Sequence, residues 1–351
     1  MQEALKKHAK GERARLLLIM LALLLLLVIT SYSASLGVNE SSMRDLYKAL
    51  YRALILQEPL EDRAQKVILH LRLPRLLLAI LAGTALGVAG VAMQAVTRNV
   101  LVSPFTIGIS SAAAFGASLA IVFNIGLFSG SLNVVFNAFF MAMSCIVLIY
   151  ILSLYMQMGA QTIVLVGIAL NYFFAALTQT SHFFASEHKL AQALHWTFGS
   201  LNLAGWPDIA FIAPVVLLCL FILLFYSKSL DVVALGDDEL ASSLGINVNK
   251  IRVLMGLIAA LATACVISFT GVIGFIGLVS PHIARMLIKS KHIYLLPFSA
   301  LIGALLLVVA DTLGRLLLAP VILPVGIVIS FIGVPLFIQL IILQRKKERF
   351  L

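Results

Sequence analysis

The chain has 351 residues, of which 62% are hydrophobic and only 11% are charged, and its mean hydropathy is +1.08. Soluble domains carry about a quarter charged residues, so this composition excludes a soluble globule, a disordered chain and a secreted disulfide scaffold. The 25 Lys and Arg residues outnumber the 15 Asp and Glu residues. Because the basic residues lie at the boundaries of apolar runs, they indicate orientation in a membrane, and we expect no nucleic-acid partner.

The apolar runs predict an all-α, polytopic membrane protein that forms a single domain over residues 1–351. A membrane-spanning helix needs about 20 apolar residues, and ten runs approach this length. They lie near residues 16–30, 75–96, 104–125, 134–158, 163–185, 208–226, 251–270, 275–288, 293–310 and 325–343. We therefore expect about ten transmembrane helices joined by short loops.

Charged segments near both termini indicate the orientation of the chain. A basic arm at residues 1–15 precedes the first span, and the tail at 345–351 is also basic. An even number of spans places both termini on one side, which the positive-inside rule assigns to the cytoplasm. Ser33-Ala34-Ser35 would also suit cleavage of a signal peptide, but the many later spans favour an uncleaved first helix.

Two loops do not follow the positive-inside rule. The expected external loop at 38–73, which we expect to contain some helix, is the longest polar stretch, and residues 38–75 hold seven basic and five acidic residues. The expected cytoplasmic loop at 228–252 holds three basic and four acidic residues. A charge pattern that topology does not explain can reflect a binding partner.

Arginines flank the expected outer ends of two spans. Arg72 and Arg75 surround Pro74, which suits the first turn of the second span. They could reach lipid phosphates or bind the carboxylates of a partner. Arg315 follows Asp311 by four residues, so an internal ion pair competes with an outward role. A cluster of Arg72, Arg75 and Arg315 would suit an acidic partner.

The segment LGDDELASSLG at 235–245 predicts a short cytoplasmic helix between two spans. Three acidic residues after Gly236 complement the dipole of a helix N-terminus, and Gly245 is a typical helix stop. The segment is either a solvated loop or a helix that docks on a cytoplasmic protein.

Glycines mark two segments that should pack closely. Gly83, Gly87 and Gly90 have the small-residue spacing that lets two helices approach each other. Residues 271–277 hold three glycines at three-residue spacing. This pattern predicts irregular or tightly packed backbone, which at membrane depth is tolerated only inside protein or beside a cavity.

Polar residues inside the fifth span share one helix face. Asn171, Thr178 and His182 are separated by seven and four residues, which places them on the same side of a helix. This face could line a pathway or form hydrogen bonds to a neighbouring helix, and the sequence leaves both interpretations open.

Patterns typical of catalysis and metal binding are missing from the sequence. It contains no GxxxxGK[ST] phosphate loop, no HExxH motif and no nucleophile elbow with a plausible triad. Cys145, Cys219 and Cys265 lie in apolar runs without CxxC spacing, and His282 has no partner ligand nearby. We expect no enzyme activity, metal site or disulfide in this chain, so any ATP would be hydrolysed by another subunit.

The sequence resembles the membrane permease of type II ABC importers, the FecCD-like family that carries ferric siderophores, haem, cobalamin and related metal chelates. The order and spacing of several segments together carry the resemblance over nearly the whole chain. These are LRLPR at 71–75, AGTALGVAGVAMQAVTRNVLVSPFTIGISSAAAFGA at 82–117, VGIALN at 166–171, HWTFGSL at 195–201, ALGDDELASSLGINV at 234–248, GVIGFIGLVSPHIARML at 271–287 and LPVGIVISFIGVPLF at 323–337.

The resemblance implies a cobalamin-permease-like fold and a particular assembly. Two copies of the permease would form a homodimer with the translocation path at its interface, in the cytoplasmic (inner) membrane of a bacterium or archaeon. Two ABC ATPase subunits would bind inside and one substrate-binding protein outside. ATP and Mg would bind in the ATPase, and this chain would hold no cofactor.

The resemblance also implies roles for individual residues. Binding-protein docking falls on Arg72, Arg75 and Arg315. The coupling loop at 228–250 contacts the ATPase through Leu235, Gly236, Asp237, Asp238, Glu239, Leu244 and Gly245. The inner gate falls on Gly159, Ala160 and Gln161, and the path on Asn171 and Thr178. Two features depart from the family pattern, namely Val100 in place of a common proline and the long charged loop at 38–73.

Other functions remain as alternatives. A secondary transporter driven by an ion gradient would need carboxylates inside the membrane, and the spans offer almost none apart from Asp311 at an edge. A membrane enzyme would need a cluster of His, Asp or Glu at membrane depth, where only isolated histidines occur. Among cargoes, a ferric siderophore comes first because it is the commonest in the family, while haem, cobalamin and molybdate-type oxyanions stay open.

Overall fold

The computed structural model describes residues 2–36, 43–52, 55, 62–156, 159–202 and 205–349, and these residues form helices without any strand. Within this part of the chain, seven helices are long and apolar enough to cross a membrane, and three shorter apolar helices accompany them. The ten are α1 (Gln2–Ser35), α4 (Leu73–Thr97), α5 (Ile109–Phe123), α6 (Ser131–Tyr155), α7 (Ala160–Phe183), α9 (Trp206–Phe225), α12 (Val248–Thr270), α13 (Ile276–Ile288), α14 (His292–Leu316) and α15 (Val325–Arg349). The predicted all-α membrane fold is confirmed.

Short helices connect the apolar ones. They are α2 (Met43–Tyr51), α3 (Arg63–Val67), the π-helical turn η2 (Ile68–Arg72), α8 (Glu187–Thr197), α10 (Ser227–Ala234) and α11 (Asp238–Ser243). The loop predicted at 38–73 contains the helix expected there. The basic arm predicted at 1–15 is, from Gln2 onward, the N-terminal part of α1.

One predicted span begins later than expected. The run at 104–125 is helical only from Ile109, and residues 101–108 form turns instead. The Ser103 amide donates to Thr106 Oγ1 at 2.9 Å, and Gly108 adopts a φ of +91°, which favours glycine. These local bonds hold the chain in a turn and delay the start of α5.

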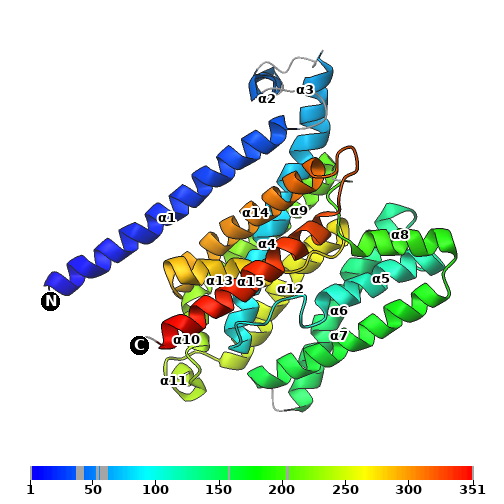
Figure 1. Cartoon of the computed structure of the whole chain (residues 1–351). Coiled ribbons are helices and arrows are strands. Elements are labelled where there is room, and N and C mark those ends of the chain that lie inside the picture. The colour runs from blue at the N-terminus through cyan, green and yellow to red at the C-terminus, as the bar shows by residue number, and fades with distance from the viewer. Residues whose placement is uncertain are drawn as a thin grey trace.

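The most buried apolar helix is α4, which packs against α9, α12, α13 and α14 (Figure 1). Its glycines allow two close backbone contacts. A Cβ at Gly83 would overlap the backbone of Gly303 in α14, and a Cβ at Gly90 would overlap that of Gly277 in α13. The interpretation of this glycine spacing as helix packing is confirmed.

The two ends of the bundle carry different connecting elements. Both described ends of the chain lie on the same side as α10 and α11, and α2 and α3 lie at the opposite side (Figure 1). The peripheral helix α1 packs mainly on α14 and exposes a long apolar flank. Such a surface is expected where a helix contacts lipid acyl chains.

Candidate functional site

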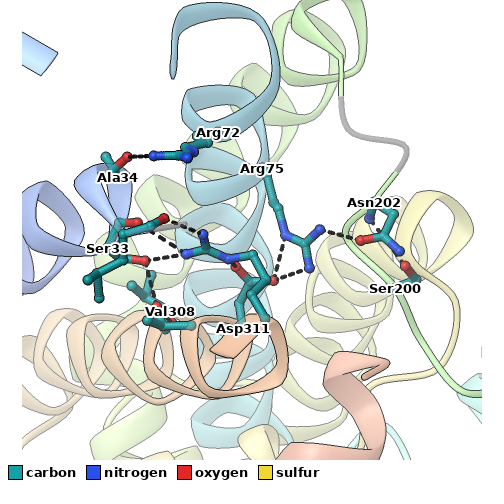
Figure 2. Close-up of polar contacts among 11 residues, drawn as sticks. Ser33, Ala34, Arg72, Arg75, Ser200, Asn202, Val308 and Asp311 are labelled. Atoms are coloured by element: carbon teal, nitrogen blue, oxygen red, sulfur yellow. Dashed lines mark hydrogen bonds and ion pairs between the residues drawn. The ribbon is translucent and has the colours of Figure 1, made fainter. Parts of the chain in front are cut away.

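Asp311 pairs with two arginines near the C-terminal end of α14, and a third arginine, Arg72, lies nearby (Figure 2). The Asp311 carboxylate has no exposed surface and accepts hydrogen bonds from Arg75 Nε at 2.7 Å and Arg315 Nε at 3.2 Å. The side chains of Arg75 and Arg315 are themselves only 12% and 11% exposed. We call Arg72, Arg75, Asp311 and Arg315 the arginine cluster. A carboxylate this deeply buried is tolerated because it is paired with two cations.

The arginine cluster also holds the C-terminal end of α1. Arg72 Nη1 donates to the carbonyl oxygen of Ala34 at 2.9 Å, and Arg315 Nη1 donates to that of Leu36 at 3.1 Å. Figure 2 shows Arg72 directed toward Ala34, and Arg75 between Asp311 and Asn202. The last carbonyls of a helix lack intrahelical partners, and cations suit that end of the dipole. The cluster therefore joins α1, α4 and α14.

These contacts bear on whether the outer arginines pair inside the chain or are available to an acidic partner. The internal pair of Arg315 with Asp311 is present, so these arginines are not wholly free for a partner. The cluster still has a net charge of +2, from three arginines and one aspartate. Arg75 also donates to the exposed side chain of Asn202. Docking of an acidic partner stays a prediction.

At the opposite end, the acidic segment forms the predicted short helix. The backbone amide of Leu240 donates to Asp237 Oδ1 at 2.9 Å, so Asp237 caps α11. Gly236 and Gly245 bracket the segment with φ values of +97° and +78°. The prediction of a helix with acidic residues at its start and glycine at its end is confirmed.

Asp238 links this helix to two apolar helices. It forms ion pairs with Arg98 at the end of α4 and with Arg252 in α12, the latter at 3.2 Å. Arg98 Nε also donates to the carbonyl oxygen of Val233 at 2.8 Å, and Tyr150 Oη in α6 donates to that of Arg252 at 2.8 Å. A displacement of α11 would therefore act on α4, α12 and α6.

Burial and the two arginines act on the pKa of Asp238 in opposite directions. Burial by itself would raise the pKa, but the hydrogen bonds and positive charges of Arg98 and Arg252 lower it more. The net result is a pKa below the ordinary value for aspartate, so the carboxylate is ionised at neutral pH.

The outer surface of the acidic segment combines leucines with acidic residues. Leu235, Leu240 and Leu244 are exposed, as are Asp237 and Glu239. Ala241 faces inward and packs with Val233 and Val248. Exposed leucines outside the apolar spans, rimmed by charge, are typical of a protein-binding surface.

Two of the three polar residues predicted on one face of the fifth span contact a neighbouring helix. Asn171 accepts a hydrogen bond from Ser111 of α5, and His182 is 3.2 Å from Ser118 Oγ of α5. Thr178 Oγ1 donates to the carbonyl oxygen of Phe174 in its own helix at 2.8 Å. Asn171 and His182 therefore form the hydrogen bonds to a neighbouring helix that one of the two interpretations expected. The other interpretation, in which Asn171 and Thr178 line a path, stays a prediction.

A different face of α7 is exposed in the chain. It carries side chains at intervals of three, four and seven residues along the helix, namely Leu165, Ile168, Tyr172, Gln179 and Phe183. At the start of α7, Gly159 and Ala160 are partly buried and Gln161 is exposed. The periodicity of hydropathy does not distinguish these faces because both are largely apolar.

Two hollows flank the irregular segment at 271–275, which separates α12 from α13 as predicted. One has a volume of about 630 Å³ and an apolar lining that includes Phe105, Phe275 and Phe331. The other, of about 600 Å³, is lined in part by polar groups of His195 and Asn202. Asn202 thereby connects the second hollow to the arginine cluster.

The known proteins that this chain resembles are membrane transport permeases. Residues 23–343 match the model of the FecCD transport family, and the chain belongs to this family of membrane transport permeases. The hemin transport system permease HmuU of Yersinia pestis is 35% identical in an alignment that covers 90% of this chain and 92% of the HmuU chain. The Fe(3+)-citrate import system permease YfmE of Bacillus subtilis is 37% identical over 98% of this chain and 100% of its own.

A solved structure supports the same assignment. It is described as an inward-facing conformation of a metal-chelate type ABC transporter. It superposes with a TM-score of 0.81 at 30% identity and covers 92% of this chain and 98% of its own. The predicted resemblance to ABC importer permeases is confirmed.

We expect Asp311→Asn to destabilise the protein by about 3–5 kcal/mol, because it leaves two buried arginines without their counter-charge. The measurement is the thermal midpoint of the purified chain in mild detergent. Glu239→Gln removes an exposed carboxylate and serves as the control, with little change expected. Equal midpoints for the two variants would contradict the role assigned to Asp311.

We expect the stabilising effect of Asp238 to depend on pH in one direction. Its lowered pKa means that the effect is present above the unfolded-state value of about 3.9 and is lost as the pH falls through the folded-state value. The thermal-midpoint difference between wild type and Asp238→Asn should stay constant from about pH 8 to pH 5 and shrink below about pH 4. The control is Asp237→Asn, which retains a capping oxygen. A difference that disappears by pH 6 would refute the assignment.

Proposed function

We propose that this chain is the permease subunit of an ABC importer that moves a ferric siderophore into the cytoplasm by alternating access. The observation that carries the proposal is the placement of two candidate partner surfaces at opposite ends of one buried helix. Arg72 and Arg75 lie at the start of α4, and Arg98, which pairs with Asp238, lies at its end. At 1.5 Å per residue, α4 spans about 37 Å.

The arginine cluster suits an external substrate-binding protein. Its net positive charge and its exposed neighbour Asn202 favour carboxylates on the partner. Because Arg75 and Arg315 are held by Asp311 and α1, they would meet a partner in a preset geometry. This arrangement limits the side-chain entropy lost on docking.

The acidic segment suits the cytoplasmic ATPase. Its exposed leucines would enter a groove on the ATPase, and Asp238 would transmit movement to α4 and α12 through Arg98 and Arg252. When ATP closes two ATPase subunits, the segments of two permease copies would move with them. The α7 helices, with Gly159, Ala160 and Gln161 at their start, would then open or close the path in the homodimer.

The orientation follows from these assignments. An ATPase on the α11 side places that side, together with both termini, in the cytoplasm. The arginine cluster then faces outward from the cytoplasmic (inner) membrane of a bacterium or archaeon. This orientation agrees with the basic residues of the N-terminal arm and the tail.

A secondary transporter is disfavoured by the state of Asp311. Such a transporter needs a carboxylate that releases and binds protons or sodium during transport. Asp311 is engaged by two arginines instead, which favours a structural role. Iron chelates are favoured as cargo by the two relatives named for hemin and ferric citrate, while haem itself, cobalamin and molybdate-type oxyanions are the alternatives to a ferric siderophore.

We expect the tagged chain, purified from native membranes in mild detergent, to bring down one ABC ATPase per permease. Leu240→Glu/Leu244→Glu should reduce the recovered ATPase by about tenfold or more, since charges replace central apolar contacts. Leu317→Glu/Leu318→Glu, at the opposite end of the bundle, is the matched control and should retain the ATPase. Mass spectrometry gives the stoichiometry.

The opposite result would change the assignment. A homo-oligomer without ATPase, under conditions that preserve a known importer, would favour a secondary transporter. The acidic segment would then be a solvated loop.

We expect cells that lack this chain to lose uptake of radioactive iron bound to a siderophore, and the wild-type gene to restore it. Haem, labelled cobalamin and labelled molybdate, tested in parallel, should enter equally with and without the chain. Loss of one of these instead would reassign the cargo and leave the importer assignment intact.

A further inference from the structure

The helix α2 belongs to the long charged loop that neither the family resemblance nor the proposed function explains. It packs against α1, α3 and η2. Figure 1 shows it beside the C-terminal end of α1, on the side of the bundle opposite both termini. The exposed apolar flank of α1 extends to Tyr32 near this end. The helix α2 therefore lies where the lipid-facing surface of α1 finishes.

The two faces of α2 differ sharply. Leu46 and Ala49 are buried against the rest of the protein. Tyr47 and Tyr51, one turn apart on the other face, are 59% and 52% exposed. Tyrosine rings that are exposed in pairs at the end of a membrane bundle are typical of the membrane–water interface.

Two cations lie beside these tyrosines. Arg44 and Lys48 are exposed and one turn apart, and neither forms an ion pair with any residue in the described part of the chain. They line an open hollow of about 760 Å³ together with both tyrosines, Leu50 and Ile55. The hollow thus combines an apolar floor with two positive charges.

We propose that α2 is an interfacial helix that binds the headgroups of anionic lipids in the outer leaflet. Tyr47 and Tyr51 would lie at the level of the glycerol backbone, and Arg44 and Lys48 would bind lipid phosphates. The apolar floor of the hollow would contact the first methylenes of the acyl chains. This role explains basic residues on a side of the membrane where the positive-inside rule disfavours them.

A soluble acidic protein is the competing occupant of this surface. The lipid is favoured because α2 packs against α1 where the exposed apolar flank of α1 ends. Exposed tyrosine and isoleucine, rather than charge alone, line the hollow, and an amphipathic helix with this composition is suited to a bilayer surface.

The test uses the full chain with Ile55→Cys carrying a nitrobenzoxadiazole fluorophore, since the three native cysteines are buried. The protein is reconstituted in vesicles of phosphatidylcholine, with or without phosphatidylglycerol, that contain lipids spin-labelled near the headgroup. Lys66→Cys, labelled in the same way on α3, is the control. We expect lipid quenching at position 55 to be about twofold or more stronger than at position 66, and stronger with phosphatidylglycerol.

Two sets of variants separate the contribution of the two cations from that of the two tyrosines. Arg44→Glu/Lys48→Glu should remove the increase caused by phosphatidylglycerol, and Arg63→Glu/Lys66→Glu, the matched reversal on α3, should not. Tyr47→Ser/Tyr51→Ser should lower quenching in both kinds of vesicle. Each variant must elute as the wild type does in size-exclusion chromatography, and the tyrosine pair provides a second reading if the charge reversal does not fold.

Two results would overturn the proposal. Quenching of position 55 by aqueous iodide but not by spin-labelled lipid would place α2 in water and favour a soluble partner. Equal quenching with and without phosphatidylglycerol would exclude recognition of anionic headgroups.

Discussion

The pairing of Asp311 with Arg75 and Arg315 is the interaction on which one end of this molecule depends. A carboxylate without exposed surface is costly to bury there unless cations pair with it. The same arginine cluster supplies the C-terminal carbonyls of α1 with hydrogen-bond donors. One buried charge therefore decides how α1, α4 and α14 meet, and it sets the positions of the arginines that a partner would encounter.

The other end of the bundle repeats this arrangement of one carboxylate paired with two arginines. There a single carboxylate, Asp238, lies on the short helix, and its arginine partners lie on α4 and α12. Between the two ends, the glycines of α4 pack closely against α13 and α14, and the helix carries no charged side chain from Leu76 to Thr97. A helix held this closely is suited to move as a rigid body, because close-packed interiors transmit displacement.

The glycine contacts show how the apolar part of the chain gains specificity without polar groups. Lipid tails are as apolar as leucine, so burial alone does not select one helix partner over another. Contacts of Gly83 with Gly303 and of Gly90 with Gly277 depend on close shape matching instead. The irregular backbone at 271–275 lies between two hollows, where such backbone can persist at membrane depth.

The sequence by itself determined the ten apolar helices, the short acidic helix and the glycine packing of α4. These features depend on local composition and spacing, which a single chain displays directly. It also placed Arg315 beside Asp311, because four residues separate them on one helix. It did not identify Arg98, Arg252 or Asn202 as members of either polar cluster.

Only the tertiary structure decided which distant groups meet. Arg75 and Asp311 are 236 residues apart, and no periodicity reports such a contact. The direction of Asn171 and His182 was undecided for a related reason. Where nearly every residue of a helix is apolar, hydropathy no longer marks the inward face, and only packing against α5 assigns it.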